Sequence, residues 1–286
     1  MPSAYRNTRA QREVQQWCAQ ALQNADFPLA RTTVDTSAGR VALTSAGTGP
    51  TQVVLVPGTA SNAAVALGWL RDLSTRWSTA VVDLPGQPGL SDPRRPRRSR
   101  LSWYGRVLDE VLVAVGAEDV VLVGNSLGAA VAMSAASPRI RARALVSPAG
   151  IVRLSVDPKL ALLSARWLFR PTVEHTRDML RLFVAPGEEP PRSEVEWMAL
   201  MAASCRTTLA PPRLPDDVLA RCAELPSVVA VGEHDRFLPP RRLGPAVHQA
   251  MATELRVLPG MGHLTTAAHL PDVVLVVGAA VAARRA

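Results

Sequence analysis

Residues 120–130 are Val-Val-Leu-Val-Gly-Asn-Ser-Leu-Gly-Ala-Ala, and this stretch decides the fold. Four aliphatic residues in a row predict a fully buried strand. A Gly-x-Ser-x-Gly turn follows, and the small, helix-prone residues from Leu127 to Ala136 come next. A serine at a sharp turn between a strand and a helix is typical of a nucleophile elbow. We therefore interpret Ser126 as a candidate nucleophile, held at a helix N-terminus where negative charge is favoured.

The pattern Gly-x-Ser-x-Gly is weak by itself. In this context its glycines would let strand and helix approach closely on either side of a strained serine. The alternative interpretation is a Gly-Ser turn that joins a strand to a helix in any doubly wound sheet. The nucleophile interpretation therefore requires a base, an orienting acid and an oxyanion hole elsewhere in the chain.

The sequence around this turn alternates between aliphatic strands and helical segments. This alternation predicts an α/β fold, with a mainly parallel sheet covered by helices on both faces. Residues 31–46 predict a hairpin, and residues 1–28 predict a helix that packs on the domain or on a neighbouring copy. Residues 151–222 carry no strand signal and include helix-like segments at 160–169, 172–184 and 194–205. We therefore expect an N-terminal helical extension (1–30), a core domain (31–150 and 223–286) and a helical insertion (151–222).

The composition is that of a globular domain. The 286 residues are 48% hydrophobic and 20% charged, which excludes a disordered chain. Three cysteines, far apart and without metal-ligand spacing, predict a reducing compartment and no disulfide framework. No signal-peptide pattern precedes the first helix, and the apolar run at 273–283 is too short to span a bilayer. We expect a cytoplasmic protein without a membrane span.

The formal net charge of +8 comes almost entirely from arginine, since Lys159 is the only lysine. The densest basic cluster is the segment Arg94–Arg100, which could meet phosphates or an acidic partner. No nucleic-acid-binding motif accompanies it. We interpret it as a solvated loop stiffened by proline and expect no nucleic-acid partner.

His263 and Asp235 are the candidate partners of the serine. His263 lies in a Gly-Met-Gly-His turn after a short strand, whereas the other four histidines lie on predicted helices or beside the candidate acid. Asp235 follows the buried strand at 227–232, so it should reach the same sheet edge as Ser126. Glu233 is the alternative carboxylate. The order Ser, Asp, His along the chain matches the order expected for a fold that uses this elbow.

The oxyanion hole requires two N–H donors directed at the developing negative charge. One candidate is the backbone N–H of Leu127, immediately after the serine. The other is the backbone N–H of Thr59, in the Pro57-Gly58-Thr59 loop after the strand at 53–56. Thr59 could also serve as a helix N-cap.

Taken together, these pieces resemble the α/β-hydrolase superfamily over roughly residues 31–283. The segments that carry the resemblance, in family order, are 57–59, 83–91, 124–128, 232–235 and 260–263. The resemblance implies an eight-stranded, mostly parallel sheet with a helical cap inserted after the sixth strand. It also implies Ser126 as nucleophile, His263 as base and Asp235 as orienting acid. Many members have His-Gly where this chain has Pro57-Gly58, so the oxyanion loop could be shaped differently.

The insertion supplies large apolar residues, which predict a mainly apolar pocket over the catalytic groups. Trp197 and Met198 are the candidate substrate contacts, although most such residues pack the cap helices together. We expect a serine esterase that acts on a small molecule with an apolar acyl or ring portion. No cofactor and no metal are expected, and a homodimer is possible.

The sequence leaves other functions open. The same three residues could cleave a thioester, a lactone or a carbon–carbon bond, because the Gly-Asn-Ser-Leu-Gly elbow is similar to that of hydrolases of ring-cleavage products. A ligand-binding protein with little turnover is a further alternative, since fold does not fix function.

Overall fold

A computed structural model describes residues 1–206 and 210–284 and contains one eight-stranded sheet. The strand order is β1-β2-β4-β3-β5-β6-β7-β8. The first two strands pair antiparallel, as does β2 with β4, and the remaining neighbours are parallel. This confirms the predicted fold class. The strands are β1 (Ala30–Thr36), β2 (Gly39–Ala46), β3 (Val53–Val56), β4 (Thr79–Val82), β5 (Val120–Asn125), β6 (Ile140–Val146), β7 (Ser227–Gly232) and β8 (Leu255–Leu258).

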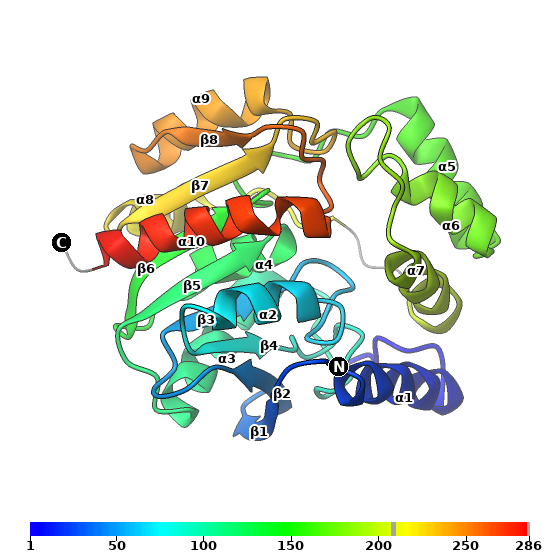
Figure 1. The fold of residues 1–286 in the computed structure, drawn as a ribbon, viewed down its shortest axis with the longest axis horizontal. Helices are drawn as coiled ribbons and strands as arrows, with labels where there is room; N and C mark the ends of the chain where they lie inside the picture. The colour runs from blue at the N-terminus through cyan, green and yellow to red at the C-terminus, as the bar shows by residue number, and fades with distance from the viewer. Residues whose placement is uncertain (207–209, 285–286) are drawn as a thin grey trace.

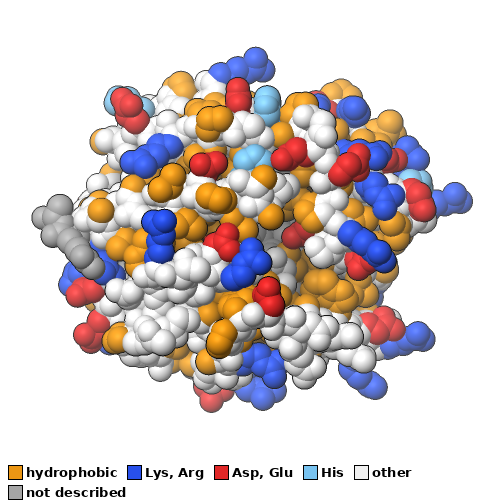
Figure 2. Space-filling view, in the orientation of Figure 1, with side chains coloured by type: hydrophobic (Ala, Val, Ile, Leu, Met, Phe, Trp, Pro, Cys, Tyr) orange, Lys and Arg blue, Asp and Glu red, His pale blue; other side chains and the backbone are white. Residues whose placement is uncertain are grey.

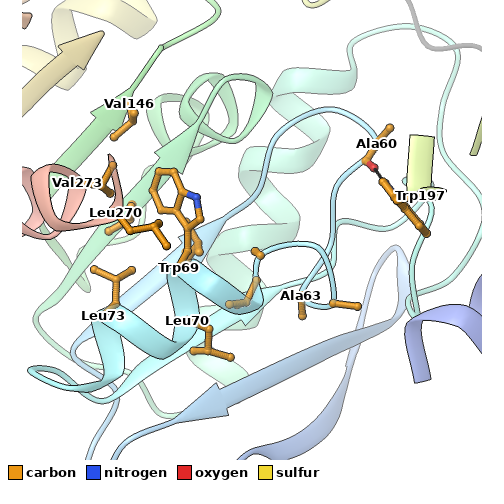
Figure 3. Close-up of a cluster of buried hydrophobic side chains, with 14 of the residues drawn as sticks. Ala60, Ala63, Trp69, Leu70, Leu73, Val146, Trp197, Leu270 and Val273 are labelled. Carbon is orange, nitrogen blue, oxygen red and sulfur yellow. Dashed lines mark hydrogen bonds between the residues drawn. The ribbon is translucent and has the colours of Figure 1, made fainter. Parts of the chain in front are cut away.

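Helices cover both faces of the sheet (Figure 1). Successive strand residues point to opposite faces, so Leu55 packs with α2 (Leu67–Ser74) and α10 (Leu270–Ala283), whereas Val54 packs with the helices of the other face. The opposite face is covered by α3 (Arg100–Ala114), α4 (Leu127–Ser134), α8 (Asp216–Ala223) and α9 (Pro240–Met251). Figure 3 shows part of the first layer, where Trp69, Leu70 and Leu73 of α2 lie near Leu270 and Val273 of α10.

The final helix begins later than the sequence indicates. We predicted it from about residue 265, but a short 3₁₀ helix, η1 (Ala267–His269), precedes α10. Pro271 is at the start of α10, where its missing N–H costs nothing.

The segment between β6 and β7 holds α5 (Pro158–Phe169), α6 (Val173–Leu180) and α7 (Arg192–Ser204) beyond the carboxyl edge of the sheet (Figure 1). Asp157 and Thr172 cap the first two of these helices through their side-chain oxygens. The fourth helix of the segment, α8, was not predicted and packs on α4 and α9 in the core. We propose that only α5–α7 function as the cap.

The N-terminal helix, α1 (Thr8–Gln23), packs against α7 (Figure 1). It begins at residue 8, because Asn7 accepts a hydrogen bond from the amide of Ala10 and caps the helix. The preceding residues bond to two distant segments: the N–H of Ala4 donates to the Pro93 carbonyl, and the N–H of Arg6 donates to the Ser204 carbonyl. The N-terminal segment is thus built into the same lobe as the cap helices.

Candidate active site

Ser126 sits at the tight turn that the sequence predicts between β5 and α4. Its backbone has φ 52° and ψ −114°, in the left-handed half of the map that side chains rarely adopt. A Cβ at Gly124 would collide with Ala129, and one at Gly128 would collide with the carbonyl of Val56. The two glycines therefore allow α4 to lie against β3 and β5, and the strained serine is held between them.

His263 and Asp235 lie beside this serine, on the loops that follow β8 and β7. The Nε2 atom of His263 is 3.2 Å from Ser126 Oγ, and its Nδ1 atom is 2.8 Å from Asp235 Oδ2. The Asp235 side chain is fully buried, and that of His263 is 13% exposed. The other carboxylate oxygen, Oδ1, accepts hydrogen bonds from the amides of Phe237 and Leu238. The side chains of Ser126, His263 and Asp235 therefore form one hydrogen-bonded chain, which we call the relay.

The surroundings keep Asp235 charged. Burial by itself would raise the pKa of this carboxyl, but the His263 ring and the amide of Leu238 outweigh it and hold the pKa below its ordinary value. A buried carboxylate next to imidazole fixes the ring orientation and favours the imidazolium form. The alternative acid, Glu233, instead accepts a hydrogen bond from the amide of Gly260 and is half exposed.

The loop after β3 lies against the elbow. A Cβ at Gly58 would be 3.5 Å from both the Asn125 carbonyl and Ser126 Cβ, so Gly58 lies next to the serine, and Thr59 lines the same cavity as Ser126. The amide of Leu127 is at the first position of α4, where a helix has no internal acceptor for it. The role of these two N–H groups as oxyanion donors stays a prediction.

Two side chains fix the backbone of this loop at Ala60, which has a positive φ of 57°. Its N–H donates to Gln87 Oε1 at 3.1 Å, and its carbonyl accepts from Trp197 Nε1 at 2.7 Å. Figure 3 shows the second bond joining α7 to the loop. Gln87 is oriented in turn by its contact with Tyr104. Trp197 thus connects α7, which lies over the site, to the loop that carries Thr59.

A cavity of about 770 Å³ opens above the three residues. Its wall is mainly apolar and includes Ser126 and His263, the predicted contacts Trp197 and Met198, and residues of α1, α5 and α7. In Figure 2, orange side chains gather right of centre, between the core and the helices α1 and α7. Trp197 is only 1% exposed, so much of its ring is used in packing. Met198 is partly buried and also lines the cavity.

Sequence reasoning missed three parts of this wall. Trp17 of α1 lies with its ring centroid 4.7 Å from that of Trp197, and its apolar helix position was the available signal. Arg95 is buried and donates to the carbonyl of Gly86, so the interpretation of 94–100 as a fully solvated loop is wrong at this residue. Glu194 also lines the cavity, and nothing in the sequence distinguishes it from a surface carboxylate.

Within residues 1–206 and 210–284, no three His, Cys, Asp or Glu side chains are grouped so that they could hold a metal ion. Across the same ranges, none of the helices has the length and apolar character needed to cross a membrane.

Comparison with known proteins identifies the family of the chain. Residues 53–276 match the model of the alpha/beta hydrolase family. The chain belongs to that family. It is also 28% identical over 213 residues to 2-hydroxy-6-oxononadienedioate/2-hydroxy-6-oxononatrienedioate hydrolase 2 of Pseudomonas putida, covering 68% of this chain and 74% of that protein.

Solved structures have the same fold. Carboxylesterase CesB of Bacillus subtilis is similar with a TM-score of 0.78 and 17% identity, over 96% of this chain and 98% of that one. Naproxen esterase of the same organism gives a TM-score of 0.76 and 18% identity, over 92% and 95% of the two chains. The match to CesB includes nearly the whole chain, whereas the family model begins at residue 53.

Proposed function

We propose that this protein is a serine hydrolase that cleaves a carboxylic ester of a mainly apolar small molecule through an acyl-enzyme. The observation that carries the proposal is the relay of Ser126, His263 and Asp235, with its two contacts of 3.2 and 2.8 Å, at the floor of an apolar cavity. A serine hydroxyl becomes nucleophilic when an adjacent base takes its proton, and the base requires an orienting partner.

The reaction follows from these positions. Ser126 Oγ attacks the ester carbonyl while its proton passes to His263 Nε2. The backbone N–H groups of Leu127 and Thr59 stabilise the negative charge that develops on the carbonyl oxygen. His263 then returns the proton to the leaving alkoxide, which departs as the alcohol. Water, deprotonated by His263, attacks the acyl-enzyme, and the proton returns to Ser126 Oγ as the acid is released.

Hydrolysis of p-nitrophenyl octanoate by wild type and by Ser126→Ala tests this proposal. Wild type should release nitrophenolate with saturation kinetics, and the variant should lose about five orders of magnitude in kcat. Equal slow release by both proteins would contradict the proposal. Circular dichroism of the variant should be unchanged, because the substitution removes one hydroxyl oxygen.

A second candidate is cleavage of a carbon–carbon bond with the same three residues. The observation that favours it is the similarity to the Pseudomonas putida hydrolase, whose name gives an oxo-dienedioate substrate. Loss of the yellow absorbance of a 2-hydroxy-6-oxo-dienoate would report this activity. A kcat/KM for that compound above the value for the octanoate ester would favour the carbon–carbon reaction.

A further inference from the structure

Glu194 is an isolated carboxyl in the apolar wall of the cavity. Of the residues that line the cavity, Arg71 is paired with Asp72, and Arg95 and Arg206 donate to backbone carbonyls. Glu194, in contrast, has no hydrogen bond or ion pair with any other group in the described ranges. Burial raises the pKa of this carboxyl to about 7, because desolvation disfavours its charged form.

The position of Glu194 on α7 lacks the partner that a helix cap usually provides. It is the third residue of the helix, where a glutamate normally reaches back to the N–H of the capping residue. The capping residue here is Pro191, which has no N–H. The next acidic residue, Glu196, lies on the outer side of the helix and pairs with Arg192. Glu194 thus lines the cavity, whereas Glu196 forms an ion pair at the surface.

A second polar atom in the same wall also lacks a partner. The indole Nε1 of Trp167 on α5 is buried and makes no hydrogen bond to any described group, although the side chain is nine-tenths buried and lines the cavity. Buried indole N–H groups usually find an acceptor. Both residues line the same cavity, and the helices that carry them, α5 and α7, pack against each other.

We propose that Glu194 and Trp167 form a polar subsite that selects substrates carrying an uncharged hydrogen-bonding group, such as a hydroxyl or a carboxamide, at a distance from the scissile bond. An alkyl end would remove water from the Glu194 carboxyl and would leave the Trp167 N–H without an acceptor, which is costly for buried polar groups. A hydroxyl or amide can both accept from the indole and exchange hydrogen bonds with the carboxyl. The subsite deepens the proposed function and rests on it for turnover.

Matched esters test this subsite. We would measure kcat/KM for the p-nitrophenyl esters of octanoate, 8-hydroxyoctanoate, 8-aminooctanoate and octanedioate (as the monoester). Wild type should prefer the hydroxy ester over octanoate by about tenfold, the effect of one well-placed buried hydrogen bond. The anionic monoester should be the poorest substrate. Preference for the amino ester, or for plain octanoate, would overturn the proposal.

Variants separate the subsite from packing. Glu194→Leu and Trp167→Phe should each remove most of the preference for the hydroxy ester, while Glu194→Gln should keep it, because the amide still donates and accepts. Glu196→Leu, an exposed position on the same helix, is the matched control and should leave the ratio unchanged. A ratio that is unaffected by Glu194→Leu would overturn the proposal even if overall activity fell.

A binding measurement keeps the result independent of turnover. Isothermal titration calorimetry with 8-hydroxyoctanamide and octanamide should show tighter binding of the hydroxy compound by wild type and not by Glu194→Leu. If no ester is hydrolysed but this difference is present, the proposed function fails and the subsite stands. If esters are hydrolysed and the difference is absent in both assays, the subsite fails and the proposed function stands.

Discussion

The floor and the roof of the cavity are built in different ways. The floor residues Ser126, Asp235 and His263 follow strands β5, β7 and β8, so backbone pairing within one sheet sets their positions. The roof comes from α1, α5 and α7. Helix α7 packs against both α1 and α5, and its Trp197 donates a hydrogen bond to the Ala60 carbonyl of the core. Such an arrangement lets the chemistry remain fixed while the roof residues determine which substrate fits.

The largest effect on activity should follow from a substitution of Asp235, in the floor of the cavity. Asp235→Asn removes the charge that fixes the orientation and tautomer of His263, and we expect kcat for an ester to fall by about 10⁴-fold. The free energy of unfolding should change far less than activity. Steady-state kinetics and urea unfolding of the same preparation check this. Glu233→Gln is the matched control, because Glu233 accepts a hydrogen bond from the amide of Gly260 and is not one of the relay residues. This variant should keep kcat within about twofold of wild type.

Gly128→Ala tests whether close packing holds the elbow. The added methyl group would collide with the carbonyl of Val56, so the substitution should lower the free energy of unfolding by about 3 kcal/mol. Gly244→Ala, in α9, meets only Leu255 at 3.7 Å and should be neutral or stabilising. Equal stability of the two variants in urea titrations would contradict the packing described for β3 and α4.

Glu194 in the roof should make stability depend on pH. Its folded pKa, about 7, lies above the unfolded value near 4.3. Between these values the folded state keeps a proton that the unfolded state releases, so the free energy of unfolding falls as pH rises through this window. The other titrating groups are the same in wild type and in Glu194→Gln, so they cancel when the two proteins are compared. Between low pH and pH 7.5, the free energy of unfolding of wild type should fall by on the order of 2 kcal/mol more than that of the variant. Parallel curves for the two proteins would contradict this.

Trp197→Phe should have the smallest effect. The substitution keeps a smaller aromatic ring against Trp17 but removes the hydrogen bond to the Ala60 carbonyl, so we expect the Thr59 amide to be less firmly placed. We expect kcat to fall about fivefold with KM nearly unchanged, because the oxyanion exists only during reaction. Trp103→Phe, at a buried tryptophan of α3 on the other face of the sheet, controls for general loss of packing. A change in KM alone would show that Trp197 acts on substrate binding instead.

The contrast between the floor and the roof also explains which parts of the site the sequence could predict. The strand, the two glycines and Ser126 are adjacent in the chain, so local sequence is enough to identify the elbow. Asp235 and His263 follow predicted strands, and parallel strands bring such loops to one edge. The contact between Trp17 and Trp197 joins residues 180 positions apart, and no periodicity within either helix indicates its partner. The burial of Arg95 and the inward position of Glu194 depend on such contacts, which is why they were missed.

Labelling with a fluorophosphonate, read by intact mass, tests the central claim most directly. Wild type should gain one adduct, on Ser126, whereas Ser126→Ala should gain none and His263→Ala should react far more slowly. Such a result would establish that the relay activates this serine. Equal labelling of wild type and Ser126→Ala, or no labelling of wild type while p-nitrophenyl acetate is also left intact, would contradict it.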